Sequence, residues 1–151
     1  YVLGDVVYQK ATKSYLKQVD KFNGKKILVR GNHDKVYSDI ELKDYFEEII
    51  PEGEGIELKI MDIPCYMTHF PSTAKKDLFN LVGHIHSAWK YQLNMYNVGV
   101  DVNHFAPINL MKIPGIFDAV SKYYDDDVWA AYSDVNSEYR GKRGKEGSYF
   151  K

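Results

Sequence analysis

The chain has 151 residues, a length that fits one domain with a buried core. Hydrophobic residues make up 44% and charged residues 27%, the ordinary balance of a soluble globular protein. The formal net charge of −1 predicts no general affinity for nucleic acid or for an anionic membrane, although a local basic patch is compatible with it.

Cysteine content and hydropathy bear on the cellular compartment and on membrane insertion. Cys65 is the single cysteine, so no internal disulfide can form, which suits a reducing cytoplasm. No apolar run approaches the roughly 20 residues that a membrane span needs. We therefore expect a cytoplasmic protein that does not insert into a membrane, and the sequence leaves its oligomeric state open.

Two short apolar runs, each followed by a polar motif, open the chain. The run "YVLGD" at 1–5 predicts a buried strand that ends at Gly-Asp, and "ILV" at 27–29 predicts a second strand before "RGNHD". Between them, residues 9–22 place apolar side chains at helical spacing, which predicts an amphipathic helix. Strand, helix and strand in this order predict a βαβ unit with parallel strands.

The rest of the chain predicts more helices and a second sheet. Residues 38–49 suggest a helix that Ser38 could cap, with Glu41 completing a capping box. The alternating residues 55–70 predict a β-hairpin in a second sheet. Further strands are predicted within 78–86 and 91–101. The segment "KIPGIFDAVSKYY" predicts a last helix, so the fold class is α/β.

Five polar side chains each follow a predicted strand: Asp5, Asn32, His69, His84 and His86. The carboxyl edge of an α/β sheet is where sites assemble, and it can bring distant residues together. Carboxylate, amide oxygen and imidazole form a mixed oxygen and nitrogen ligand set that suits Mn²⁺, Fe or Zn²⁺. Each residue alone has an ordinary interpretation as a turn or a structural histidine, so the prediction depends on their ordered combination.

The spacing of His84 and His86 favours two metal ions. In an extended segment these side chains point the same way about 6–7 Å apart, which suits two ions about 3.5–4 Å apart. The Asp5 carboxylate could bridge such a pair, and the two ions would turn a bridging water into hydroxide and neutralise a phosphate. His33 could then protonate the leaving oxygen as a general acid.

In order, "GD", "GNHD", a histidine and "GHIH" resemble the calcineurin-like metallophosphoesterases, over residues 1 to about 105. The resemblance is closest to the small single-domain bacterial and phage members. It implies a two-sheet α/β sandwich with a dinuclear metal site at one edge. It also implies a hydrolase that acts on phosphate monoesters or diesters. Two divalent ions are implied as cofactors, with Mn favoured and Fe, Zn or Ni as alternatives.

The resemblance also assigns metal ligands. Asp5 is implied as the bridging carboxylate. Asn32, His69 and His84 are implied as ligands of the second metal, and His86 as a ligand of the first.

Three residues of the "RGNHD" segment have expected roles other than metal binding. His33 is implied as the leaving-group acid, with Asp34 supporting the loop from behind. Arg30 lies beside the site in the sequence, and we infer from this position that it steadies a phosphate oxygen, with a plain surface arginine as the alternative. The "NVGVD" segment at 97–101 also resembles small family members and would place Asn97 and Gly99 near the site, or else form a plain strand and turn.

The chain departs from the family at one motif. The family opens with D-x-H on its first strand, and no D-x-H occurs in this sequence. We expect that motif upstream of Tyr1, with the chain being a fragment. Asp5 and His86 alone would then remain for the first metal, and the chain as given is expected to be inactive. The alternatives are a non-catalytic remnant that serves as a binding module, and a nuclease whose basic "RGKRGK" segment holds nucleic acid.

The expected domain organisation has three parts. Residues 1–115 form the metallophosphoesterase domain, with its N-terminal strand missing. Residues 116–139 form a helical and aromatic extension, and residues 140–151 form a mobile basic tail.

Overall fold

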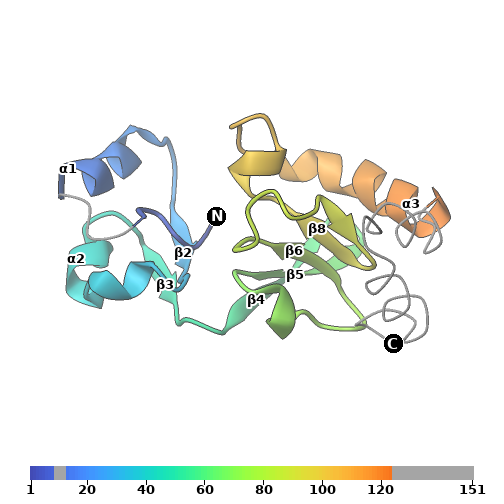
Figure 1. Cartoon of the computed structure of the whole chain (residues 1–151), viewed down its shortest axis with the longest axis horizontal. Helices are drawn as coiled ribbons and strands as arrows, with labels where there is room; N and C mark the ends of the chain where they lie inside the picture. Colours follow the sequence, from blue (N-terminus) through green and yellow to red (C-terminus); the bar gives the residue numbers. More distant parts are fainter. Residues whose placement is uncertain (9–12, 124–151) are drawn as a thin grey trace, which may run out of the picture.

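The structure, a computed structural model that describes residues 1–8 and 13–123, has a mixed α/β fold with two sheets (Figure 1). The first sheet contains β1 (Val2–Leu3), β2 (Ile27–Val29) and β3 (Glu48–Ile50) in that order. Both strand pairs are parallel. The helices α1 (Lys13–Leu16) and α2 (Asp39–Lys43) lie on the side of this sheet away from the second sheet (Figure 1).

The second sheet has five strands in the order β4-β5-β6-β8-β7. Its strands are β4 (Gly55–Ile60), β5 (Ile63–Thr68), β6 (Phe79–Val82), β7 (Tyr91–Gln92) and β8 (Met95–Asn97). The central strands β5, β6 and β8 run parallel, and an antiparallel strand closes each edge. The carboxyl ends of three parallel strands therefore meet at one edge of this sheet.

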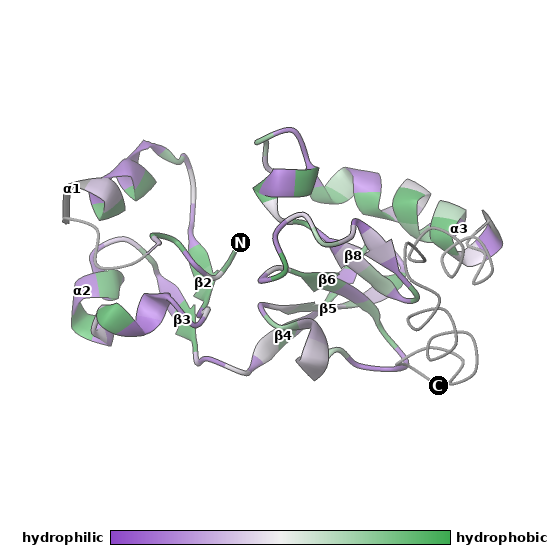
Figure 2. Ribbon diagram, viewed as in Figure 1, coloured by the Kyte–Doolittle hydropathy of each residue, from purple (hydrophilic) through white to green (hydrophobic). Residues whose placement is uncertain are grey.

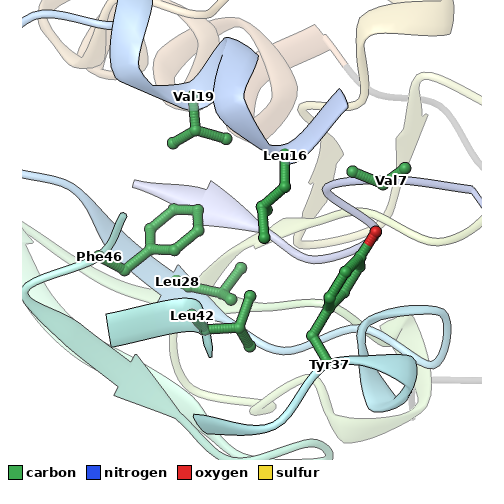
Figure 3. Close-up of a cluster of buried hydrophobic side chains, with 7 residues drawn as sticks. All are labelled: Val7, Leu16, Val19, Leu28, Tyr37, Leu42 and Phe46. Carbon is green, nitrogen blue, oxygen red and sulfur yellow. The ribbon is translucent and has the colours of Figure 1, made fainter. Parts of the chain in front are cut away.

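A hydrophobic core lies between the first sheet and its helices. Leu28 of β2 and Leu42 of α2 are fully buried and pack against Leu16 and Phe46 (Figure 3). Burial of a side chain of this size contributes about 1.5–3 kcal/mol relative to exposure, so these contacts fix the helices on the sheet.

A second core lies between the second sheet and α3 (Ile113–Tyr123). Ile113 is fully buried, and Phe117 packs edge-on against Phe79 of β6 with ring centroids 5.3 Å apart. Figure 2 shows hydrophobic stretches on β2, on β6 and along α3. Leu3 of β1 also packs against this second cluster, so the first strand of the chain touches both halves of the molecule.

Several sequence predictions are confirmed. The chain is α/β, β1 and β2 are parallel, and residues 55–68 form an antiparallel hairpin with Gly55 opposite Thr68. The capping box at α2 is present. Ser38 Oγ accepts from the Glu41 backbone N–H at 3.3 Å, and Glu41 Oε2 accepts from the Ser38 backbone N–H at 3.0 Å.

Three predicted elements differ in extent. The helix expected over 38–49 ends at Lys43, because Glu48–Ile50 pairs with β2 as a strand. The single strand expected over 91–101 is a hairpin of β7 and β8 that turns at Leu93, whose φ is 51°. Within the helix expected over 9–22, α1 is followed by a 3₁₀ helix at Lys17–Lys21, and residues 9–12 lie outside the described part.

The expected domain boundary at 115 falls inside α3, whose Ile116, Phe117 and Val120 pack against the second sheet. Residues 124–139 and the basic segment 140–151 lie outside the described residues. Among the residues that are described, no helix combines the length and apolar character needed to cross a membrane.

Candidate metal centre

Four polar side chains meet where strand ends of the two sheets lie together. Asp5 and Asn32 come from the loops after β1 and β2. His69 and His84 come from the loops after β5 and β6. The ligand atoms of Asp5, His69 and His84 all lie within 4.8 Å of one another. The sequence predicted that these residues meet, and the shared carboxyl edge of parallel strands accounts for each pair within its own sheet. The two pairs meet because these edges of the two sheets lie together.

The potential ligand atoms are evenly spaced. His69 Nε2 lies 3.1 Å from Asn32 Oδ1, 3.2 Å from His84 Nδ1 and 3.4 Å from Asp5 Oδ2. His84 Nδ1 lies 2.9 Å from Asn32 Oδ1. Around an ion with bonds of about 2.1 Å, adjacent ligand atoms are about 3.0 Å apart at right angles and about 3.4 Å apart in a tetrahedron. The spacing of these side chains therefore fits one divalent cation.

A backbone carbonyl fixes the tautomer of His69. Its Nδ1 lies 2.7 Å from the Leu3 carbonyl oxygen, which can only accept, so Nδ1 carries the proton. In the neutral ring, Nε2 then presents a lone pair toward Asn32 Oδ1 and Asp5 Oδ2. His69 is only 1% exposed, so water gives this lone pair little compensation.

Lone pairs consequently converge with few protons between them. When Asp5 is a carboxylate and both histidines are neutral, only His84 Nδ1 among the four facing atoms can supply a proton. A divalent cation would satisfy all four atoms at once, and the oxygen and nitrogen donors suit Mn²⁺, Fe or Zn²⁺.

Glycines permit this close approach. A Cβ on Gly4, whose φ is 76°, would lie 2.4 Å from His69 Nδ1. A Cβ on Gly31 would lie 2.3 Å from Asp5 Oδ1. The glycines of "GD" and "GNHD" are therefore required by the packing of the site as well as by the turns they form.

The backbone carries strain at the site. Asp5, His84 and His86 have φ values of 53°, 70° and 48°, in the left-handed region. The Ile85 N–H donates to the Gly83 carbonyl at 2.8 Å, which closes a three-residue turn centred on His84. A turn of this hand is rare, and such conformations cost about 1–3 kcal/mol each and concentrate at functional sites.

Asp34 ties the two loops of the first sheet together. Its carboxylate accepts backbone N–H groups of Asp5 at 2.8 Å, Val6 at 2.9 Å and Gly31 at 2.8 Å. Burial raises the pKa of Asp34, while these three donors act in the opposite direction. Asp34 thus fixes Asp5 relative to the loop that carries Asn32, and the resemblance implied a supporting role for this residue.

The electrostatics of His84 favour a neutral ring. Burial lowers its pKa most, and the neighbouring His69 lowers it further, whereas the Asp5 carboxylate raises it. A neutral imidazole is the form that binds a metal ion.

His33 and Arg30 lie beside the cluster with different contacts. The His33 backbone N–H donates to Asp5 Oδ1 at 2.9 Å, and its ring lies 4.7 Å from the Tyr8 ring. The Arg30 guanidinium binds the Asp39 carboxylate and the backbone carbonyls of Asp34 and Tyr37. These contacts hold the turn after β2, so the phosphate contact predicted for Arg30 stays a prediction.

His86 stands apart from the other expected ligands. Its Nδ1 lies 3.3 Å from Asp101 Oδ2, and its side chain is 69% exposed. Sequence reasoning did not find this contact. It also missed Phe70, whose ring packs 4.6 Å from His69 and 4.8 Å from His84. The adjacency of Phe70 to His69 in the chain was the available signal.

These features define an α/β protein with a candidate metal cluster at the meeting of two sheets. No protein-family model matches the chain, and no curated protein matches it. A crystal structure of AQ665, a protein of unknown function from Aquifex aeolicus, matches with a TM-score of 0.53 and 24% sequence identity. The match covers 76% of this chain and 73% of that chain. At this identity, the similarity concerns the fold alone.

Proposed function

We propose that this protein is a metallophosphoesterase of the calcineurin-like type, which hydrolyses phosphate monoesters or diesters. The observation that supports the proposal most is the convergence of four ligand atoms. His69 Nε2 lies 3.1–3.4 Å from Asn32 Oδ1, His84 Nδ1 and Asp5 Oδ2, and His84 Nδ1 lies 2.9 Å from Asn32 Oδ1. These atoms come from the four motifs on which the resemblance depends. The two sheets would then form the two-layer core of the family sandwich.

The metal ions, when bound, supply positive charge that neutralises the phosphate and acidifies water for attack at neutral pH. Asp5 is the residue that would serve both ions, and its carboxylate is held in place by the His33 N–H, which donates to Oδ1, while Oδ2 faces His69. Asn32, His69 and His84 would hold one ion, and His86 would contribute to the other. Mn²⁺ is the favoured metal.

His33 would act as the general acid. Its backbone N–H donates to Asp5, the residue is half-buried, and His33 is close enough to His84 to lower the pKa of that histidine. From there the ring would donate a proton to the leaving oxygen of the ester. Asp34 would keep this loop in register through its three backbone hydrogen bonds.

The decisive assay uses the protein expressed from its complete reading frame, with Mn²⁺ and two chromogenic substrates, a phosphomonoester and a phosphodiester. We expect turnover of at least one. His33→Ala should lower kcat by about 10²–10⁴-fold, the usual contribution of a general acid, while Mn²⁺ affinity is unchanged. Asn32→Ala should lower both turnover and Mn²⁺ affinity.

A matched control is available in His104, which is exposed and has a left-handed φ of 57°, like His84 at 70°. His104→Ala reproduces the backbone cost of His84→Ala outside the cluster, and it should leave turnover and Mn²⁺ affinity unchanged. Wild-type rates in both His33→Ala and Asn32→Ala would refute the proposal.

A further inference from the structure

His86 and Asp101 come from different loops, so their contact depends on how the two loops are held relative to each other. His86 lies in the loop after β6, and Asp101 lies in the 3₁₀ helix Val100–Val102 after β8. The Nδ1 atom of His86 lies 3.3 Å from Asp101 Oδ2. The two side chains are 69% and 39% exposed, so the pair contributes little to stability.

A buried amide holds the loop that carries His86. Asn97, at the end of β8, is fully buried, and its Nδ2 donates to the carbonyls of His86 at 2.7 Å and Trp89 at 2.8 Å. Its Oδ1 accepts from the Gly99 backbone N–H at 2.9 Å. The same side chain therefore binds the His86 loop and the start of the Asp101 loop.

A second buried amide completes the link. Asn103 Nδ2 donates to the carbonyls of Asn97 at 3.0 Å and Gly99 at 2.8 Å. Its Oδ1 accepts from the Tyr96 hydroxyl at 2.8 Å. Each polar atom of the two amide side chains has a partner, so the segment from Asn97 to Asn103 has a defined shape and places Asp101 next to His86.

The contact puts an acceptor next to Nδ1 of His86, with Asp101 Oδ2 3.3 Å away. A carboxylate can only accept, so a neutral His86 whose ring N–H donates to Asp101 has its proton on Nδ1. Its Nε2 then presents the lone pair. A histidine ligand that donates its other N–H to a carboxylate is the usual arrangement at metal sites, and the carboxylate fixes the tautomer and the ring orientation.

We propose that Asp101 is a positioning residue for His86, and that the Asn97–Asn103 amide pair sets its position so that His86 Nε2 is presented as a metal ligand. The proposal rests on the proposed function, since His86 is there assigned to the first metal, the ion that Asn32, His69 and His84 do not hold. It adds the residue that orients this ligand, and it gives the "NVGVD" segment a role at the site.

The first test needs no metal. In the metal-free 151-residue chain, at a pH where imidazole is neutral, ¹⁵N NMR of the histidine rings should show His86 with its proton on Nδ1. In Asp101→Ala the proton should move mainly to Nε2. Asp101→Asn keeps an acceptor oxygen without the charge, so it should give an intermediate population.

The second test measures Mn²⁺ affinity in the protein expressed from its complete reading frame. Asp101→Ala should lower the affinity for one of the two Mn²⁺ ions by about 10–100-fold, and Asp101→Asn should lower it by less. Asp118→Ala is the matched control. Asp118 is an exposed carboxylate on α3 that pairs with Lys122 at 2.7 Å, so its loss changes the net charge equally without touching the His86 loop.

The two proposals fail in different ways. If the wild-type protein binds no Mn²⁺, the proposed function is wrong and this inference falls with it. If the wild type binds two Mn²⁺ ions and Asp101→Ala leaves the His86 tautomer and both affinities unchanged, the inference alone is overturned.

Discussion

At the scale of single residues, the candidate site combines lone pairs that face one another with backbone that is locally strained. His69 Nε2, Asn32 Oδ1 and Asp5 Oδ2 are acceptors in one small space, beside His84 at a φ of 70°. Proteins keep such costs where the surrounding structure enforces them for a function. For Asp5, the fully buried Asp34 carboxylate supplies that enforcement by accepting three backbone N–H groups, those of Asp5, Val6 and Gly31.

The pKa of His84 gives a prediction for the metal-free protein. Burial and His69 lower the pKa of His84, so an NMR titration should place it below the ordinary value of about 6.5. Asp5→Asn removes the charge that raises it, so the pKa should fall further. A value above 6.5 in the wild type would contradict this account.

The same shift has a consequence for stability. Below about pH 6.5 the unfolded chain binds a proton on His84 that the folded protein binds less readily. The contribution of His84 to the free energy of unfolding is therefore complete above that pH, and it is lost as the pH falls from about 6.5 toward the lower folded-state pKa. In urea titrations, the free energy of unfolding of wild type should fall relative to that of His84→Gln as the pH is lowered through this window.

Gly31 offers a steric prediction. In Gly31→Ala the new Cβ would lie 2.3 Å from Asp5 Oδ1 and 2.7 Å from His69 Cε1, so these atoms must move apart. We expect a loss of about 1–3 kcal/mol in the free energy of unfolding and weaker Mn²⁺ binding. Gly115→Ala in α3 is the control, because a Cβ there meets nothing within 4 Å. It should stabilise the protein by about 0.5–1 kcal/mol and leave Mn²⁺ affinity unchanged.

At the scale of elements, the turn and strand signals were more informative than the helix periodicity. Parallel pairing of β1 with β2 and the 55–68 hairpin were predictable, because short apolar runs next to Gly-Asp or alternating residues have few other interpretations. The helix over 38–49 was predicted too long, since Ile49 and Ile50 suit a strand as well as a helix. Pairing with β2, a non-local contact, decided between them.

The dependence on non-local contacts also explains which site residues could be predicted. Asp5, Asn32, His69 and His84 lie in the loops that follow strands, so strand order brings Asp5 to Asn32 and His69 to His84, and the packing of the two sheets joins the two pairs. The contact of Asp101 with His86 depends on loop conformations that two buried amides fix. Periodicity and motif spacing carry no signal for such contacts.

The capping box of α2 gives a prediction that is independent of the site. Ser38→Ala removes the oxygen that accepts from Glu41 N–H, so it should cost about 1 kcal/mol in urea unfolding, within a range of about 0.5–2 kcal/mol. Mn²⁺ affinity should not change, because the cap lies on the outer side of the first sheet. A large loss of Mn²⁺ affinity in this variant would contradict the location of the metal site away from the cap of α2.

At the scale of the whole molecule, the cluster takes ligands from both sheets, with Asp5 and Asn32 on one and His69 and His84 on the other. A bound ion would therefore link the two halves. At a free Mn²⁺ concentration of 100 Kd, the folded state should gain about 2.7 kcal/mol, which corresponds to a rise in Tm of about 5–10 °C. Calorimetry should show this rise in wild type and His104→Ala, and little of it in Asn32→Ala.

The central claim is that Asp5, Asn32, His69 and His84 hold a divalent cation, and ¹⁵N NMR of the histidine rings during a titration with diamagnetic Zn²⁺ tests it most directly. We predict that the resonances of His69 Nε2 and His84 Nδ1 shift together and saturate at the same Zn²⁺ concentration, while His104 stays unchanged. Unshifted His69 and His84 resonances at a Zn²⁺ excess would contradict the account.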